Sequence, residues 1–313
     1  MKMLSIVLTP GAWAVDTFPF LRYLPLMPFK AKAKEWNKLL NDLLDTPMNF
    51  VYDKMKAGDG EPCLVSRWIE RSIKAKPQTS EDEDEESLIK WAGVAIVAAG
   101  SDTTISAVAT FFALMNAHPE VQAKAQAEMA RVIGNDRLPT YADRESLPYI
   151  EAVYKEVLRW HPIVPIGVPH VFTSVEDDEF RGMRIPKGSV VFGLIGNMLR
   201  NPQVYHEPTV FNPERFMGAT VMNPEDIIFG FGRRRCPGIN VAHSSLWLVI
   251  ALTLATYNIT PALGADGKPE TPDMSFTNGT VSHIKPYKCT ITPRSSKAVA
   301  LIEASIFQMG VSS

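Results

Sequence analysis

An unbroken helical stretch over residues 87–118, which Pro119 closes, sets the strictest limit on how this chain folds. Two parts of the stretch, residues 91–99 and 105–115, are apolar or small almost all round. A helix without a polar stripe lies in an interior, so we expect the rest of the chain to pack around it. The chain has 313 residues, of which 46% are hydrophobic, and it is long enough to bury such a helix.

Other elements follow from periodicity and from helix-breaking residues. We predict helices over residues 30–54, 120–133, 146–160 and 239–256. Short strands and turns follow, including strands over residues 189–194 and near 278–293, with a long irregular stretch over 201–235. The acidic run 81–86 is expected to form a solvated loop that favours the start of the next helix. Neither an internal repeat nor a clean linker divides the chain, so we predict a single domain over residues 1–313.

Charge and hydropathy limit the partners of the chain. Its net charge of -2 gives no reason to expect nucleic-acid binding. We find no segment long and apolar enough to span a bilayer. Residues 12–29 are too rich in proline for one regular helix, and they suit either a loop that covers the core or a surface that meets a membrane. Residues 1–14 loosely imitate a secretion signal, but Pro10 and Gly11 interrupt the apolar run and favour a packed segment.

The segment Phe-Gly-Phe-Gly-Arg-Arg-Arg-Cys-Pro-Gly at residues 229–238 carries the sharpest chemistry. Its glycines allow a tight turn and a close approach to a flat ligand. Arginines before Cys236 and helix amides after it favour a thiolate, which is what a haem iron takes as an axial ligand. The alternative is a buried cysteine beside a basic turn. Cys63 and Cys289 have no supporting pattern, and three cysteines make no disulfide framework.

Two weaker patterns lie upstream. Glu156 and Arg159 are three residues apart on a predicted helix, where such a pair is most often a surface contact worth a few tenths of a kcal/mol, about 0.3. Asp102 and Thr103 interrupt the long apolar helix, and a buried acid there needs a partner or a water. Taken alone, Asp102 is equally well explained as a solvated or cap-like residue.

Taken in order, these segments resemble those of the cytochrome P450 family. Phe229, Gly232, Arg234, Cys236 and Gly238 match its haem-binding loop in spacing. Residues 156–159 resemble its Glu-x-x-Arg helix, and residues 211–216 resemble the later segment whose arginine completes a Glu-Arg-Arg network. Residues 99–104 resemble the oxygen-binding kink of its long central helix.

The resemblance implies roles for named residues. Cys236 would bind the iron of haem b as an axial thiolate, and Phe229 and Gly232 would shape and shield its loop. Arg234 and His170 would each meet a haem propionate. The resemblance assigns the remaining roles as follows: Glu156, Arg159 and Arg215 form the structural network, and Asp102 and Thr103 deliver protons to iron-bound dioxygen.

The implied fold is mainly α-helical with small β-sheets. The resemblance runs nearly end to end, but only to the C-terminal two-thirds of the family's domain, so a membrane anchor, the first strands and the early helices are expected to be missing. An incomplete domain leaves one flank of the haem open, and a haem-free, inactive fragment is therefore a rival interpretation.

The implied activity is monooxygenation of a small, apolar substrate with O2 and with electrons from NADPH through a flavin-containing cytochrome reductase. The motifs are similar to those of fungal microsomal members, many of which act in secondary metabolism. The full-length family faces the cytosol from the endoplasmic reticulum membrane. A haem-thiolate peroxygenase or isomerase, which needs no reductase, is a further alternative, and Asp102 and Thr103 argue against it.

Overall fold

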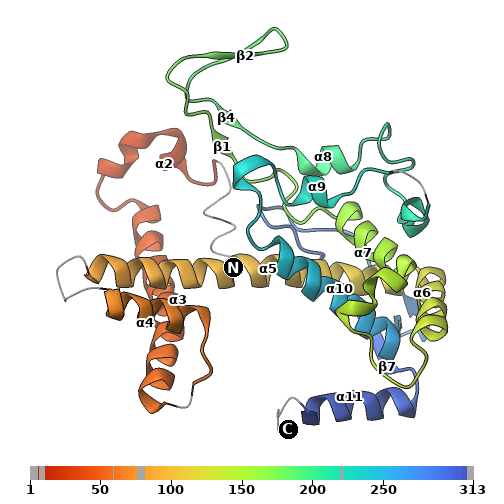
Figure 1. Cartoon of the computed structure of the whole chain (residues 1–313). Helices are drawn as coiled ribbons and strands as arrows, with labels where there is room; N and C mark the ends of the chain where they lie inside the picture. Colours follow the sequence, from red (N-terminus) through yellow and green to blue (C-terminus); the bar gives the residue numbers. More distant parts are fainter. Residues whose placement is uncertain (1–5, 7–10, 59, 76–81, 219–220, 309–313) are drawn as a thin grey trace. The chain divides into compact units, whose positions relative to one another are not determined.

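The computed structural model describes residues 6, 11–58, 60–75, 82–218 and 221–308. The chain divides into two compact units, Met1–Asp102 and Thr103–Ser313. Most of the described residues are helical, and the sheets are small and antiparallel, which confirms the predicted fold class (Figure 1). The single domain expected over residues 1–313 stays a prediction, and most of the predicted packed segment over residues 1–14 lies outside the described residues.

The first unit is helical throughout its described elements. It contains α2 (Ala14–Thr17), the 3-10 helix η1 (Pro19–Tyr23), α3 (Pro28–Ala57), α4 (Leu64–Ala75) and the first part of α5 (Asp82–Ala117). As predicted, residues 12–29 do not form one helix. Gly58 ends α3 because its positive φ of 72° is accessible to glycine at little cost. We did not predict α4.

The prediction of a solvated loop over residues 81–86 was wrong, because α5 begins at Asp82. Backbone amides at a helix N-terminus carry partial positive charge, so acidic residues stabilise the first turn that they occupy. The helix is therefore longer than the apolar stretch that revealed it. Its residues up to Asp102 belong to the first unit and those from Thr103 to the second.

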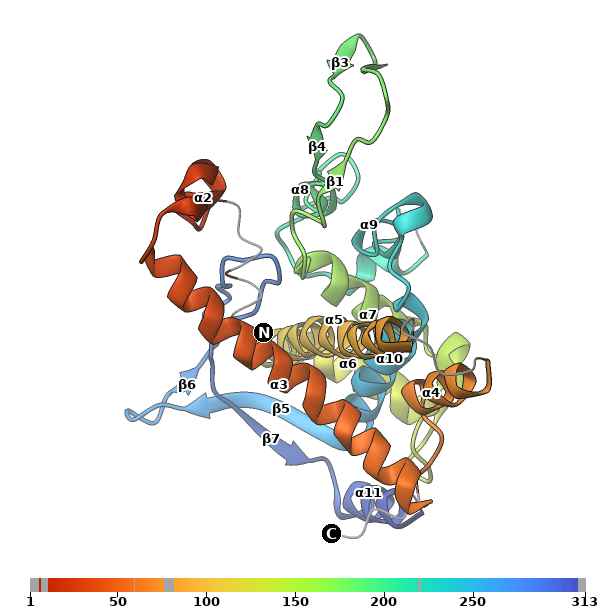
Figure 2. The same cartoon turned by 90° about the vertical axis from the view of Figure 1, so that its left-hand side faces the viewer.

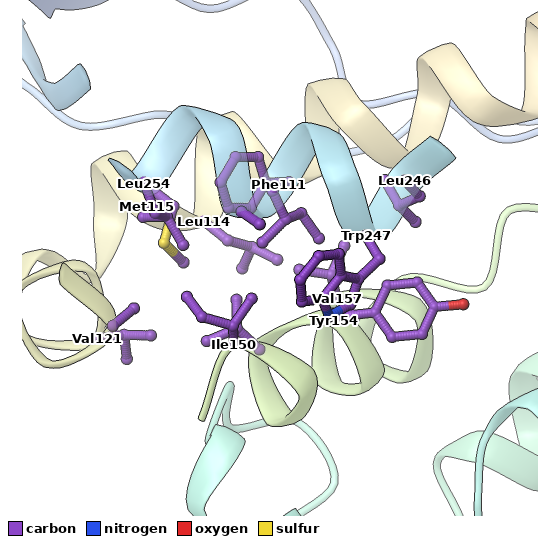
Figure 3. Packing of buried hydrophobic residues seen from close by; sticks show 14 of the residues in the cluster. Phe111, Leu114, Met115, Val121, Ile150, Tyr154, Val157, Leu246, Trp247 and Leu254 are labelled. Atoms are coloured by element: carbon purple, nitrogen blue, oxygen red, sulfur yellow. The ribbon is translucent and has the colours of Figure 1, made fainter. Parts of the chain in front are cut away.

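Four helices of the second unit enclose its main core. They are α5 from Thr103 on, α6 (Pro119–Val132), α7 (Pro148–Trp160) and α10 (Ile239–Thr256). Figure 3 shows Phe111 of α5, Tyr154 of α7 and Trp247 of α10 meeting in this core, where all three are fully buried. The predicted apolar helix is thus a core element in this unit, and α10 has the predicted bounds.

Small strands complete the second unit. β1 (His170–Val171) pairs with β4 (Val190–Val191), and β2 (Asp178–Phe180) pairs with β3 (Met183–Ile185). β5 (Tyr257–Leu263) lies between β6 (Pro269–Glu270) and β7 (Cys289–Pro293), and α11 (Ser296–Gln308) follows β7 and packs on it (Figure 2). The strand predicted over residues 189–194 is only two residues long, Val190–Val191, and α8 (Ile195–Leu199) follows after an irregular stretch over 192–194. Neither β5 nor α11 was predicted.

Two helices of the described chain are long and apolar enough to cross a membrane, at Glu85–Ala117 and Ile239–Thr256. We predicted no such segment, and by length and composition that prediction was wrong. In both stretches serine and threonine interrupt the aliphatic residues and alanine, so neither stretch is an unbroken aliphatic run although its mean hydropathy is high. The core helix of a protein that never enters a bilayer passes the same test, and α10 packs on α6 and α7 in the core.

Candidate functional site around Cys236

The loop that carries Cys236 is closed by its own backbone. It follows α9 (Glu225–Ile228), contains the 3-10 helix η4 (Gly232–Arg234) and leads into α10. The N–H of Cys236 donates to the carbonyl of Phe229 across the loop, over 2.8 Å. Gly230 and Gly232 have φ values of 75° and 59°, in the left-handed region that side chains with a Cβ rarely adopt. The closed turn leaves Cys236 exposed just ahead of α10.

The residues that flank Cys236 in the sequence include exposed basic and exposed apolar side chains. Arg233 and Arg234 are exposed within η4. Arg235 donates to the carbonyl of Glu225 over 3.2 Å and lies 3.6 Å from the carboxylate of Asp226, so its charge is partly neutralised. Apolar groups are also left uncovered near the cysteine in sequence: Phe231 is 50% exposed and Val241 is 71% exposed.

This arrangement fits a haem. The donor is an exposed thiol just ahead of α10, and a cysteine sulfur is one of the axial ligands that a haem iron takes. A Cβ added at Gly230 or Gly232 would meet nothing within 4 Å, so the glycines keep open space beside the loop. A flat apolar group can cover the exposed Phe231 and Val241, and arginines suit its anionic substituents.

The structure brings Glu156, Arg159 and Arg215 together. Arg159 binds the Glu156 carboxylate through Nε and Nη2, over 2.7 and 2.8 Å, and Arg215 Nε donates to the same carboxylate over 3.1 Å. Both Glu156 and Arg159 are fully buried, and the Arg215 side chain is 7% exposed. The spacing of Glu156 and Arg159 alone predicted a surface contact. The structure shows a buried ion pair instead.

The two arginines also order the irregular stretch after α7. Arg159 donates to the carbonyls of Leu199 and Pro208 over 3.0 and 2.8 Å. Arg215 donates to the carbonyls of His206 and Val210 over 2.6 and 3.0 Å. Backbone groups that have no strand or helix partner thus find charged donors, which stabilises a segment without regular structure.

The remaining predicted site residues lie on other elements. Asp102 and Thr103 are adjacent and half-buried on α5, and they stand on either side of the boundary between the two units. His170 is exposed in β1, where it pairs with Val191 of β4. Phe229 is half-buried at the end of α9. The roles assigned to these residues stay predictions.

The sequence did not reveal a buried polar group beneath the cysteine loop. Tyr154 donates its hydroxyl to Glu225 over 2.5 Å, and His243 Nε2 lies 3.0 Å from the same carboxylate. Burial, reinforced by the charge of Glu225, raises the pKa of Tyr154. These residues come from α7, α9 and α10, so no motif or spacing joins them.

Comparison with known proteins identifies relatives over nearly the whole chain. The family model described as Cytochrome P450 matches residues 1–291. Cytochrome P450 monooxygenase claR of Ampulloclitocybe clavipes is 43% identical over 96% of this chain and 56% of its own length. Cytochrome P450 monooxygenase 208 of Postia placenta is 44% identical over 96% of this chain and 58% of its own length. The chain thus spans less than two thirds of these relatives.

Solved structures agree with the sequence relatives. A zebra fish cytochrome P450 determined with progesterone has a TM-score of 0.70 and 26% identity, over 87% of this chain and 61% of that one. A zebra fish cytochrome P450 determined with abiraterone has a TM-score of 0.65 and 29% identity, over 79% of this chain and 58% of that one.

Proposed function

Because this chain belongs to the cytochrome P450 family, we propose that Cys236 binds the iron of haem b as an axial thiolate and that the chain is part of a monooxygenase. The observation that carries the proposal is the exposed thiol, presented ahead of α10 by a loop with two glycines at positive φ. When bound, the haem supplies the activation of O2 that places one oxygen atom in a substrate.

The predicted site residues have distinct tasks in this proposal. Arg234 pairs with one haem propionate and His170 with the other, because each offers a cationic or donor group at an exposed position. Phe229 accepts the N–H of Cys236 and Gly232 supplies a positive φ, and both keep the loop closed. Glu156, Arg159 and Arg215 hold the stretch that precedes the loop.

We further propose that Asp102 and Thr103 hold and pass a proton on α5. Both are half-buried on α5, and a carboxyl and a hydroxyl group are side-chain types that can hold and pass a proton. This role favours a monooxygenase over a haem-thiolate peroxygenase or isomerase.

Electrons would come from NADPH through a flavin-containing cytochrome reductase. Arg233 and Arg234 are exposed in η4, and a positive turn of this kind complements an acidic partner and speeds its encounter. Arg235 contributes less, since Asp226 partly neutralises it. The proposed substrate is a small apolar molecule, and the proposed setting is secondary metabolism, which the fungal origin of the relatives favours.

The proposed location is the cytosolic face of the endoplasmic reticulum membrane. Residues 12–29 support contact with the membrane surface, because Phe18, Phe20 and Tyr23 are 54%, 60% and 72% exposed and Leu26 is 98% exposed. Aromatic side chains of this kind partition into the headgroup region of a bilayer.

The test is the carbon-monoxide difference spectrum of the chain as it stands, after reconstitution with haem and reduction. A red-shifted thiolate band that disappears in Cys236→Ser and persists in the matched Cys63→Ser variant supports the site, since Cys63 is also exposed. Failure to retain haem would support the second candidate, an inactive fragment. The observation behind this candidate is that the chain covers only 56–58% of the relatives' length. Turnover with peroxide but not with NADPH and reductase would favour a peroxygenase.

A further inference from the structure

A buried carboxylate, that of Glu225, lies where three helices of the second unit meet. Glu225 is the first residue of α9 and is only 8% exposed. Its Oε1 accepts the hydroxyl of Tyr154 on α7 over 2.5 Å, and its Oε2 accepts the amide of Asn223 over 3.2 Å. A buried acid with several partners is costly to break and holds the elements that supply those partners.

His243 brings the third helix to the same carboxylate. Its Nε2 is buried 3.0 Å from Oε1 of Glu225, although the angle is poor for a hydrogen bond. The His243 ring also lies against the Tyr154 ring, with 5.5 Å between centroids. Because α10 begins just after the cysteine loop, this contact joins the segment that enters the loop to the helix that leaves it.

The loop is also tied back directly beside the thiol. Arg235, the residue before Cys236, donates to the backbone carbonyl of Glu225 over 3.2 Å. The entry, the exit and the residue next to the cysteine therefore all meet at one residue. A contact that closes a chain segment reduces the number of conformations that the segment can adopt.

Charged groups around His243 complete the cluster. Arg144, in the 3-10 helix η2 (Tyr141–Ser146), binds Glu151 of α7 over 2.7 and 2.9 Å, and Lys155 lies 3.4 Å from Glu151. Burial lowers the pKa of His243, and the charge of Glu225 opposes that effect. The negative charges of Glu151 and Glu225 are thus nearly balanced by the positive charges of Arg144 and Lys155. Such a balance lets these side chains stay packed together.

We propose that Glu225 is a positioning residue for Cys236: its carboxylate holds α9 to α7 through the hydrogen bond from Tyr154, and His243 of α10 packs against both side chains, so that the cysteine loop keeps one arrangement. That this arrangement matters for iron binding rests on the proposed function. The contacts of Glu225 and their effect on the loop do not depend on it. Its effect is therefore measurable in the chain without haem.

The first experiment compares Glu225→Gln and Glu225→Ala with the unchanged chain. Hydrogen exchange of amides 229–238 and alkylation of Cys236 by iodoacetamide are followed by mass spectrometry, with Cys63 as the internal reference and amides of α10 as the reference for global unfolding. In Glu225→Ala we expect loop exchange to accelerate about tenfold and Cys236 alkylation to change severalfold, while Cys63 and the α10 core keep their rates. Glu225→Gln retains an acceptor for Tyr154 and should lie between the two.

The matched control is Glu128→Gln. Glu128 is another carboxylate of the second unit with 8% exposure, but its oxygens accept from the amides of Tyr149 and Ile150 at the start of α7. A general loss of stability would appear in both variants, whereas faster exchange confined to residues 229–238 would appear only in the Glu225 variants. Tyr154→Phe, which removes one hydroxyl, should give a smaller effect that is not additive with Glu225→Gln.

Reconstitution with haem separates this proposal from the proposed function. If the unchanged chain shows a thiolate band, the Glu225 variants should convert a larger fraction to a form without thiolate ligation than Glu128→Gln does. If the unchanged chain retains no haem, the proposed function fails and the exchange data alone decide whether Glu225 holds the loop. Loop exchange and Cys236 alkylation in Glu225→Ala that equal those of the unchanged chain would overturn the proposal.

Discussion

The Arg159 guanidinium holds the Glu156 carboxylate by two parallel hydrogen bonds of 2.7 and 2.8 Å, and both side chains are fully buried. The residues are neighbours on one face of α7, so the helix presents them to each other before any tertiary contact forms. Arg215 adds a second cation to the same carboxylate, and the two arginines place backbone carbonyls of an irregular stretch around it.

Glu156→Ala should lower the free energy of unfolding by about 3–5 kcal/mol, because it leaves two buried arginines without their carboxylate. Urea unfolding followed by circular dichroism measures the change. The control is Asp143→Ala, which breaks an Arg137–Asp143 pair with bonds of 2.8 and 2.6 Å whose arginine is half exposed. Asp143 also accepts from the N–H of Thr140, so the control should cost about 1–2 kcal/mol. If both variants lost the same free energy of unfolding, burial of the Glu156 carboxylate would not be what makes its contacts strong.

Glu128→Gln should destabilise the chain by about 1–3 kcal/mol, since it weakens acceptance from two amides at the start of α7. Those amides have no partner within the helix, so the side chain serves as a cap supplied by α6. Hydrogen exchange at Tyr149 and Ile150 should accelerate first. Glu303→Gln, an exposed change on α11, should leave both measurements unaltered.

Stability should fall as the pH drops from about 6.5 toward 4 because of His161. Burial lowers the pKa of this histidine to about 4, although its contact with the carbonyl of Ser282 opposes the shift. The unfolded chain takes up the proton near pH 6.5 and the folded chain only near 4, so stability present above pH 6.5 is lost over that window. The loss attributable to His161 should be about 3 kcal/mol.

Urea unfolding at several pH values checks this expectation. His161→Phe keeps a ring to stack on Phe276, whose centroid lies 3.6 Å from that of His161, but it removes the titrating group and should flatten the dependence. His206→Gln is the control, because the His206 side chain is 90% exposed and its replacement should leave the slope unchanged. A slope that persists in His161→Phe would show that other groups cause it.

Phe111→Ala should cost about 3–5 kcal/mol, because Phe111 is fully buried between α5, α7 and α10 and its loss leaves a cavity (Figure 3). Phe180→Ala, on the 55% exposed residue at the end of β2, should cost less than about 1 kcal/mol. Thermal unfolding of the two variants beside the unchanged chain measures the difference. Similar losses would mean that the core of the second unit does not limit stability.

Local patterns in the sequence determined much of this protein. Apolar periodicity and helix-breaking residues fixed α10 at its observed bounds and α7 to within two residues at its start, because helix formation depends on neighbours in the chain. The glycines, arginines and cysteine of residues 229–238 predicted the cysteine loop, since positive φ values and a helix N-terminus are local requirements. The same local reasoning missed α4 and α11, although Ser295 accepts from the N–H of Ala298 at the start of α11.

Only the tertiary structure decided which of these elements meet. Arg215 reaches Glu156 across an irregular stretch, and Glu225 collects Tyr154 and His243 from α7 and α10. Likewise β5 finds β7 after a long loop, which no alternation in either segment predicts. The physical reason is that burial makes these contacts strong, and burial is a property of the packed chain rather than of any short segment. The sequence identifies Cys236, but only the packing places Glu225 beneath its loop.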